Sequence, residues 1–412
     1  MNICILGKYP PIQGGVSTCN YWLSKALGQR GHKVFVVTNA EEAGFEYREQ
    51  IYPSDARQLE PKNVRVFSTQ PLSRRFIPQY QPFIAKLASM AIEIVKKNKI
   101  DVLYSNYLLP YGVAGLLVKQ ATGVPWFLDH AGSDITNLFD EPELRPIFLE
   151  LFKNADLVVN SPQVKSRLVD SGVIPEDKLS PSIGKMSYTR ALDDSFHPQA
   201  KPFDLSDYFD RFNRRLPVFT FLGKISPLKK TFAFVEAAAK LPKGKFYLLF
   251  VTEKGRMRIH LRNLIREKGL LPYTCLLDFK PPWLVPSIIT ASTAVVAPES
   301  EETPYLPEGT HGSKIGLEAM LCGRCAVIGK GMSKKAFYYG CKDKEHFLVV
   351  DPHNINTFAK KLKLIVDDPG LAYKIGKKAR AVWTARRNFF EASLDLFVKN
   401  FKIAILKNSC LR

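Results

Sequence analysis

Short apolar segments alternate with helical segments along this chain in two successive series, and this pattern restricts the fold more than any other feature of the sequence. The first series predicts strands at residues 2–6, 34–38, 64–68, 102–105, 125–129 and 157–161. The second series predicts strands at residues 217–222, 245–252, 275–278, 292–297 and 325–328. Apolar strands that alternate with helices are typical of parallel sheets covered on both faces. The sequence therefore predicts an α/β fold with two doubly wound, Rossmann-like domains.

The stretch from 185 to 215 separates the two series. It is rich in Asp, Pro, Phe and Arg and interrupts the alternation, so we interpret it as a linker. We place the domains at 1–200 and 201–388 and expect them to face each other across a ligand cleft. Residues 389–412 carry apolar side chains at helical spacing, which predicts a helix that packs back on the N-terminal domain. An amphipathic membrane helix is the alternative.

The composition is that of a globular protein. Charged residues make up 24% of the 412 residues and hydrophobic residues 46%, which excludes a disordered or collagen-like chain. No apolar run approaches the roughly 18 residues of a membrane-spanning helix, and the apolar start is too short for a signal peptide. The seven cysteines are scattered and suggest no disulfide framework, so we expect a cytoplasmic protein.

The net charge of +20 is concentrated in the second half of the chain. Residues 1–200 contain 22 Lys/Arg and 20 Asp/Glu, whereas residues 201–412 contain 37 and 19. A basic half favours an anionic partner: a nucleotide diphosphate, a nucleic acid or an acidic bilayer surface. A solvated surface that only keeps the protein soluble is an equally open interpretation.

Two loops of the first half are candidate binding segments. The loop that ends in Gly14-Gly15 joins a predicted strand to a helix, and paired glycines there let backbone N–H groups approach an anion. His130 follows the predicted strand 125–129 directly and lies beside Gly132. A tight turn and a structural histidine are the alternative interpretations of these two features.

The second half has two further candidate loops. Lys224 and Lys229 follow a strand and a glycine, so they could hold a diphosphate; a solvated loop is the alternative. A glycine-rich segment then leads into a helix that begins near Ser313, where free N–H groups would face a phosphate or a sugar. Glu318 lies on an apolar face of that helix and needs a partner, for which a ribose diol is suitable.

These motifs resemble the retaining glycosyltransferases of the GT-B fold, family 4, and the resemblance covers nearly the whole chain. It rests on Gly14-Gly15-Val16, His130 with Gly132-Ser133-Asp134, Ala155-Asp156 with Ser161, Phe196-His197-Pro198, Gly223-Lys224 with Lys229, Pro298, and Glu318-Ala319-Met320 with Gly323. The last two groups, in this order and spacing, are the specific part.

The resemblance implies that the C-terminal domain binds a nucleoside-diphosphate sugar and that the N-terminal domain binds the acceptor. The donor phosphates would be bound by Lys224 and Lys229, although this family usually has arginine at the first position. Glu318 matches the glutamate that binds the ribose. His130 matches a histidine near the transferred sugar, and Gly15 would approach the donor or the acceptor through its backbone.

The chain departs from the family pattern in one place. A first glutamate usually stands eight residues before the ribose-binding glutamate, and this position is Thr310 here, while Glu308 is two residues too early. We therefore include both residues with His130 as candidate catalytic residues. His311, Gly312, Ser313 and Lys314 complete the candidate donor-binding loop.

The resemblance implies no metal and no other cofactor, and the sequence contains neither a DxD motif in a suitable loop nor a His/Cys cluster. We expect a glycan, lipid or small-molecule acceptor of glycoconjugate or polysaccharide biosynthesis. Peripheral contact with the inner face of an anionic membrane is a further expectation; a nucleic-acid partner is not expected, because no RNA or DNA motif is present. A nucleotide-sugar epimerase of the same architecture and a catalytically inactive nucleotide-sugar-binding homologue remain alternatives.

Overall fold

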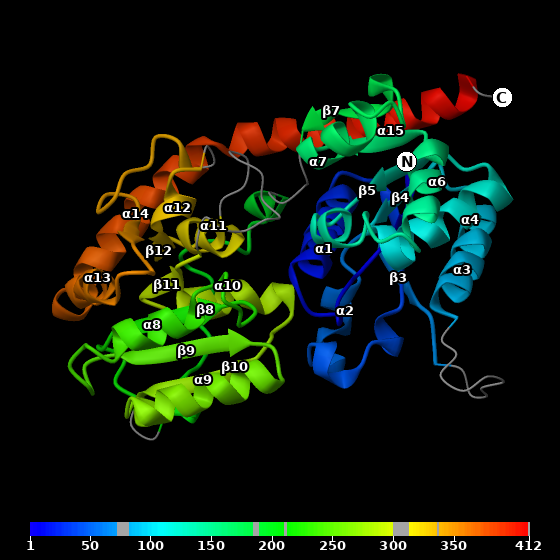
Figure 1. Cartoon of the computed structure of the whole chain (residues 1–412). Coiled ribbons are helices and arrows are strands. Elements are labelled where there is room, and N and C mark those ends of the chain that lie inside the picture. The colour runs from blue at the N-terminus through cyan, green and yellow to red at the C-terminus, as the bar shows by residue number, and fades with distance from the viewer. Residues whose placement is uncertain (72–81, 184–188, 210–211, 300–312, 336–337, 411–412) are drawn as a thin grey trace. The chain divides into compact units, whose positions relative to one another are not determined.

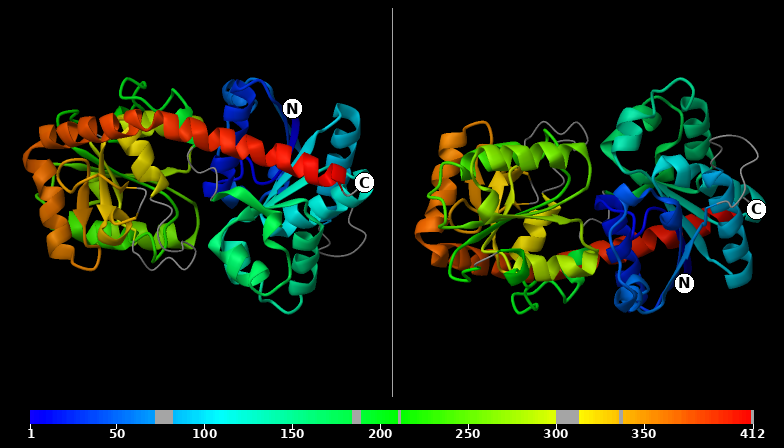
Figure 2. Two further views of the ribbon diagram at one scale, coloured as in Figure 1. Left: turned by 90° about the horizontal axis from the view of Figure 1, so that it is seen from above. Right: turned by 90° about the horizontal axis from the view of Figure 1, so that it is seen from below.

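The chain folds into two compact units. The computed structural model describes residues 1–71, 82–183, 189–209, 212–299, 313–335 and 338–410. The first unit comprises Met1–Thr189 together with Phe389–Arg412, and the second comprises Arg190–Asn388. Each unit is a parallel sheet with helices on both sides (Figures 1 and 2). The predicted fold, two Rossmann-like α/β domains, is confirmed.

The sheet of the first unit has seven described strands in the order β3-β2-β1-β4-β5-β6-β7. Their bounds are β1 (Asn2–Leu6), β2 (Lys33–Thr38), β3 (Val64–Ser68), β4 (Val102–Asn106), β5 (Trp126–Asp129), β6 (Leu157–Asn160) and β7 (Leu179–Ile183). The central strands are buried along almost their whole length, because helices cover both faces and leave no polar side. The strand order reverses between β1 and β4, so the loops after these strands border the expected ligand crevice.

Helices of the first unit cover the two faces of this sheet (Figure 1). They are α1 (Gly15–Gln29), α2 (Ala56–Leu59), α3 (Phe83–Asn98), α4 (Val113–Thr122), α5 (Ser133–Asn137), α6 (Arg145–Asn154), α7 (Pro162–Val164) and α15 (Arg387–Cys410). Single 3-10 or π turns are η1 (Ala40–Glu42), η2 (Phe45–Tyr47), η3 (Pro53–Asp55), η4 (Leu108–Gly112), η5 (Lys165–Val169) and η6 (Glu176–Lys178). Among the described helices, none is both long and apolar enough to cross a bilayer.

The sheet of the second unit has six described strands in the order β10-β9-β8-β11-β12-β13. The strands are β8 (Val218–Leu222), β9 (Tyr247–Thr252), β10 (Thr274–Asp278), β11 (Ala294–Ala297), β12 (Cys325–Gly329) and β13 (Leu348–Val350). The helices are α8 (Thr231–Ala238), α9 (Arg256–Glu267), α10 (Val285–Thr290), α11 (Lys314–Leu321), α12 (Lys330–Ser333), α13 (Ile355–Asp367) and α14 (Pro369–Ala385). The short turns are η7 (Thr189–Leu192), η8 (Ser206–Tyr208), η9 (Leu271–Tyr273) and η10 (Pro282–Leu284). Here the order reverses between β8 and β11.

Side chains alternate between two apolar clusters on the faces of this second sheet. Phe219 and Phe250 join the larger cluster, which also contains Phe234 of α8 and Phe358 of α13. The intervening residues of the same strands, such as Leu249, join a smaller cluster with Ile288 of α10. The sheet is thus fixed between two helical layers, and only its strand ends and loops are free for binding.

The boundary between the units differs from the predicted one. The second unit begins at Arg190 instead of residue 201. The reason is that the intervening segment is tied to α14 and its end: Arg380 donates to the Phe196 carbonyl at 3.3 Å, and Arg387 pairs with Asp194 at 3.1 Å. A segment of linker composition is therefore an ordered part of the second unit.

A carboxyl group is buried where the first glycine loop meets the segment after η2. The Glu49 N–H donates to the Pro11 carbonyl at 2.7 Å, and Ile12 forms an isolated bridge with Arg48. Glu49 is only 7% exposed, and its Oε2 atom has no hydrogen-bond partner among the described residues. Burial raises the pKa of Glu49 well above its ordinary value. The folded protein therefore holds this proton to a higher pH than the unfolded chain does.

We expect the stability gained by Glu49→Gln, relative to the wild type, to increase as the pH rises. Below the ordinary carboxyl pKa of about 4.3, both proteins carry a neutral group and should be similarly stable. Above it, the unfolded wild type ionises first, so its native state loses stability until the pH passes the raised folded pKa. The variant avoids this loss, which is about 1.4 kcal/mol for each unit by which the pKa is raised. Denaturant unfolding between pH 4 and pH 8 measures it, with the exposed Glu46→Gln as control. A gain that does not grow with pH would contradict the prediction.

Candidate active site

The loops after β8 and β11 flank the point where the strand order of the second sheet reverses. Gly223 follows β8 directly and has φ +154°, a conformation that favours glycine. Lys224 and Lys229 lie in the same loop, and Lys230 precedes α8 with φ +51°. The predicted cationic loop is thus at the strand ends where nucleotides bind in doubly wound sheets.

A buried carboxylate connects this loop to the start of α11. Glu299 comes just after β11 and is 6% exposed. Its Oε1 atom accepts hydrogen bonds from the Lys229 ammonium and from the Ser313 hydroxyl, the latter at 3.3 Å. Sequence reasoning missed Glu299, although a carboxylate directly after an apolar strand and next to a cationic loop was a usable signal. Lys229 is consequently held in one place, with part of its charge balanced by Glu299.

A second carboxylate holds the other end of the cationic loop. The Ile225 N–H donates to both oxygens of Glu253, at 2.9 and 3.0 Å. Burial raises the pKa of Glu253, and the neighbouring Lys224 opposes that rise. The loop that carries both lysines is therefore fixed by Glu253 on one side and Glu299 on the other.

Helix α11 supplies the second part of this candidate site. Ser313 precedes its first residue, and the Ser313 side chain bonds Glu299 and makes no cap hydrogen bond to α11 within the described chain. The Ser313 carbonyl accepts from Tyr338 Oη at 3.2 Å, and a Cβ at Gly316 would lie 2.8 Å from that hydroxyl. This close packing fixes the start of α11, whose first-turn N–H groups favour an anion.

The predicted donor-binding residues are only partly within the described chain. Lys314 is the first residue of α11, and Glu318 lies one turn further along with 4% of its surface exposed. The other predicted residues of this loop, Glu308, Thr310, His311 and Gly312, lie outside the described residues.

Cys322, directly after α11, and Cys325, the first residue of β12, are both buried. Burial raises the pKa of Cys322, and the nearby Glu318 carboxylate raises it further. Burial also raises the pKa of Cys325 to about 12. Both side chains are thiols at neutral pH, which leaves no thiolate for redox or nucleophilic chemistry.

His130 lies at the end of β5, as predicted, but the first unit covers its ring. The residue is 1% exposed. Its Nδ1 atom lies 3.0 Å from the Gly132 nitrogen, and its Nε2 atom lies 2.7 Å from Ser161 Oγ. The turn around it is fixed by Asp134, which accepts from the backbone N–H groups of Ala131, Ile135 and Leu108.

Gly15 is the first residue of α1, at the carboxyl edge of the same sheet. The backbone conformation that favours glycine belongs to its neighbour Gly14, which has φ +116°. A Cβ added at Gly15 would meet no atom within 4 Å, so the described chain leaves room for a side chain there. Only a bound ligand would exclude one. Gly14 is the N-cap of α1 and offers no side chain to cap it. No side chain of the described residues caps the first turn of α1, and binding of an anion or a sugar there stays a prediction.

Two residues that sequence reasoning missed stand where the first sheet reverses its order. Lys8 Nζ, after β1, lies 4.3 Å from the ring centroid of Tyr107, after β4. Tyr107 has φ +95°, a strained value for a side chain of this size, and its hydroxyl lies 3.2 Å from Ser133 Oγ. Lys8, the lysine of the first loop, could have been recognised in the sequence as a candidate. Its aromatic partner Tyr107 could not, because it is remote in sequence.

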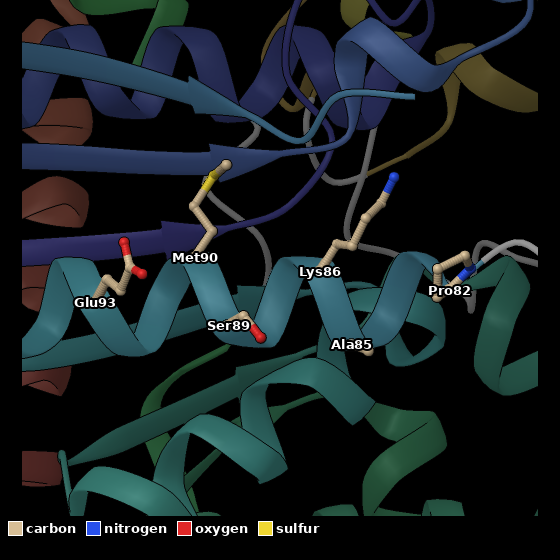
Figure 3. A pocket seen from close by; sticks show the side chains of 6 residues that line it. All are labelled: Pro82, Ala85, Lys86, Ser89, Met90 and Glu93. Atoms are coloured by element: carbon tan, nitrogen blue, oxygen red, sulfur yellow. The ribbon is translucent and has the colours of Figure 1, made fainter. Parts of the chain in front are cut away.

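The structure also contains an open hollow of about 490 Å³ along one face of α3 (Figure 3). It is lined by Pro82, Ala85, Lys86, Ser89, Met90 and Glu93. None of the predicted site residues lines it. Lys86, the cationic side chain among the described lining residues, is paired with Glu42.

Known protein families match both units. The model of Glycosyltransferase Family 4 matches residues 13–180, and the model of Glycosyl transferases group 1 matches residues 209–382. The chain has two α/β units, each with a parallel sheet, and a cationic loop at a strand-order reversal. Together with these features, the matches define the class: the chain is a GT-B glycosyltransferase. Its N-terminal domain is of the family 4 type and its C-terminal domain of the group 1 type. The resemblance to GT-B glycosyltransferases is confirmed.

Particular relatives are more distant. The chain is 27% identical over 153 residues to the N-acetyl-alpha-D-glucosaminyl L-malate synthase of Bacillus anthracis, a match that spans 36% of each protein. The sucrose-phosphate synthase of Thermosynechococcus elongatus has a TM-score of 0.64 and 18% identity, with 98% of both chains covered. Anabaena HepE in complex with UDP and glucose has a TM-score of 0.63 and 17% identity, covering 98% of this chain and all of that one. At these identities the solved structures show the fold.

Proposed function

We propose that this protein is a retaining glycosyltransferase that transfers a sugar from a nucleoside-diphosphate sugar to an acceptor of glycoconjugate or polysaccharide biosynthesis. The observation that carries the proposal is the fixed pair of anion-binding elements in the second unit. Lys229 and the start of α11 are linked through Glu299, at the reversal point of the sheet. Similar structures were solved with UDP and with UDP-glucose, which supports a donor of this class.

Each candidate residue has a defined role in this proposal. Lys224, Lys229 and the first-turn N–H groups of α11 stabilise the diphosphate as it leaves, which requires no metal ion or other cofactor. His311, Gly312, Ser313 and Lys314 are assigned to donor binding. Glu318 accepts hydrogen bonds from the ribose hydroxyls.

The remaining roles concern the sugar and the acceptor. His130 acts on the transferred sugar, and Glu308 or Thr310 takes the place of the first glutamate of the family. Gly15 lets the backbone of α1 approach the donor or the acceptor. The relative from Bacillus anthracis is an N-acetyl-alpha-D-glucosaminyl L-malate synthase, which supports a small hydroxy acid among the candidate acceptors here.

A panel of donors tests the proposed function. The full chain is mixed with UDP-, GDP- and ADP-sugars, and thermal stability is measured, since a ligand that binds the native state stabilises it by RT ln(1 + [L]/Kd). The stabilising donor is then incubated with glycan, lipid and hydroxy-acid acceptors, and the anomeric configuration of the product is read by NMR. A product of retained configuration supports the proposal. Donor epimerised without acceptor indicates an epimerase, and binding without turnover indicates an inactive homologue.

The proposal extends to peripheral contact with an anionic membrane through the basic second half. Lys374 and Lys377 are exposed on α14. Anionic lipid attracts such residues by about 1 kcal/mol each, so replacing both by Gln should weaken vesicle binding about thirtyfold. Sedimentation with anionic and neutral vesicles measures this, and Lys96 and Lys97 of the nearly neutral first half provide the matched control. Equal binding to both kinds of vesicle, or none to either, would refute membrane contact.

A further inference from the structure

The hydrogen bonds around His130 define the position of its ring proton. The Gly132 N–H donates to Nδ1 at 3.0 Å, so Nδ1 is an acceptor and carries no hydrogen. The proton of the neutral imidazole is therefore on Nε2. That atom lies 2.7 Å from Ser161 Oγ, so Nε2–H donates to the serine hydroxyl. His130 is thus held as the Nε2–H tautomer.

Ser161 is itself fixed where it receives this hydrogen bond. It is the N-cap of α7, and its Oγ atom accepts the Val164 N–H at 3.2 Å. The residue is 8% exposed, compared with 1% for His130, so the contact lies in a region from which water is largely excluded. A hydroxyl oxygen has two lone pairs, and the backbone and the imidazole use both of them. The oxygen therefore has little freedom to turn away from the ring.

The neighbouring carboxylate of Asp134 does not hold the His130 ring by a hydrogen bond. Asp134 Oδ1 lies 3.9 Å from His130 Nδ1, beyond hydrogen-bond distance. That oxygen already accepts from the N–H groups of Ala131 and Ile135, both at 2.9 Å. Asp134 shapes the turn that presents the Gly132 N–H, and Ser161 engages the opposite edge of the ring.

We propose that Ser161 is a positioning residue for His130: by accepting the Nε2–H hydrogen bond, it fixes the plane and the tautomer of the imidazole that acts on the transferred sugar. This role rests on the proposed function, in which His130 acts on that sugar. A ring held in one plane and one tautomer does not have to reorient when charge develops, and such preorganisation is what transition-state stabilisation requires.

The contact itself is tested by NMR on the full chain labelled with ¹⁵N-histidine, without any substrate. The His130 resonances are assigned by their absence in His130→Gln. The wild type is expected to show the Nε2–H tautomer and a ring proton protected from exchange with water. Ser161→Ala should speed that exchange at least tenfold, whereas Ser161→Thr should preserve the protection. A wild-type ring protonated at Nδ1, or protection unchanged in Ser161→Ala, would overturn the proposal.

The role is tested by turnover of the donor found in the panel. Ser161→Ala should lower kcat about tenfold with little change in donor KM, the loss expected for one hydrogen bond to a buried group. Ser161→Thr should restore kcat. In a His130→Ala background, Ser161→Ala should have almost no further effect, because it acts through the ring. Ser24→Ala, which removes a buried hydroxyl on α1 of the same unit, should leave kcat unchanged.

The outcomes separate this role from the proposed function. Independent, additive losses in Ser161→Ala and His130→Ala would overturn the positioning role while transfer itself stands. Absence of any sugar transfer by the wild type, with the NMR signature intact, would overturn the proposed function and this role with it, and would leave a purely structural contact.

Discussion

Replacing Glu318 by alanine is expected to raise the KM for the donor by one to two powers of ten, with a much smaller effect on kcat. The proposed role of this carboxylate is to bind the ribose in the ground state and the transition state alike, and loss of such uniform binding appears in KM. A hydrogen bond to a charged group contributes roughly 1.5–3 kcal/mol, which corresponds to that range. Steady-state kinetics and calorimetric titration with the nucleoside diphosphate measure it.

The burial of Glu318 calls for two control variants. The residue is 4% exposed, so Glu318→Gln is needed as a variant that keeps the shape of the side chain and removes the charge. Glu267→Ala removes a carboxylate of the same unit whose side chain is 73% exposed, and it should leave the donor KM unchanged. If Glu318→Ala and Glu318→Gln both bind the diphosphate like the wild type, Glu318 does not bind the ribose.

The sequence predicted most strands because most of them are buried on both faces. β1 reads Asn-Ile-Cys-Ile-Leu, and a run of this kind is apolar whichever face each residue points to. β7 reads Leu-Ser-Pro-Ser-Ile and lies at one edge of its sheet, where a proline is tolerated because fewer backbone donors are needed. β13 is also an edge strand and has only three residues. Neither edge strand has enough apolar sequence to be recognised, so both were missed.

The candidate site shows a different limit of sequence reasoning. A strand followed by Gly223 and lysines predicts a cationic loop from local pattern alone. The carboxylate that holds Lys229 is 70 residues away, and it meets the lysine only because β8 and β11 are neighbours in the sheet. Likewise, Ser161 is 31 residues from His130 and follows a different strand. Such pairings depend on strand order, which the pattern of apolar runs does not specify.

The C-terminal segment illustrates how a local pattern can predict a tertiary contact. Its apolar residues recur at helical spacing, which predicted that one face of the helix packs on the N-terminal domain. In the structure, Phe397 is 2% exposed and Phe401 is fully buried. Phe397 packs edge-on against Tyr104 of β4, with the ring centroids 5.5 Å apart, and lies 5.7 Å from the ring of Phe127 of β5. The last helix thus forms part of the core of the first unit.

Phe397→Ala is therefore expected to destabilise the first unit by about 3–5 kcal/mol, the usual range when a buried phenylalanine is truncated and a cavity remains. Hydrogen exchange of the β4 and β5 backbone amides in the full chain measures this loss for the first unit itself, which a single unfolding midpoint of a two-domain protein does not. Phe389→Ala makes the same chemical change on the same helix at a residue that is 61% exposed, and it should change stability by no more than about 0.5 kcal/mol. Unchanged amide protection in Phe397→Ala would mean that α15 contributes nothing to this core. A loss in Phe389→Ala as large as that in Phe397→Ala would mean that the effect does not come from burial of the Phe397 ring in this core.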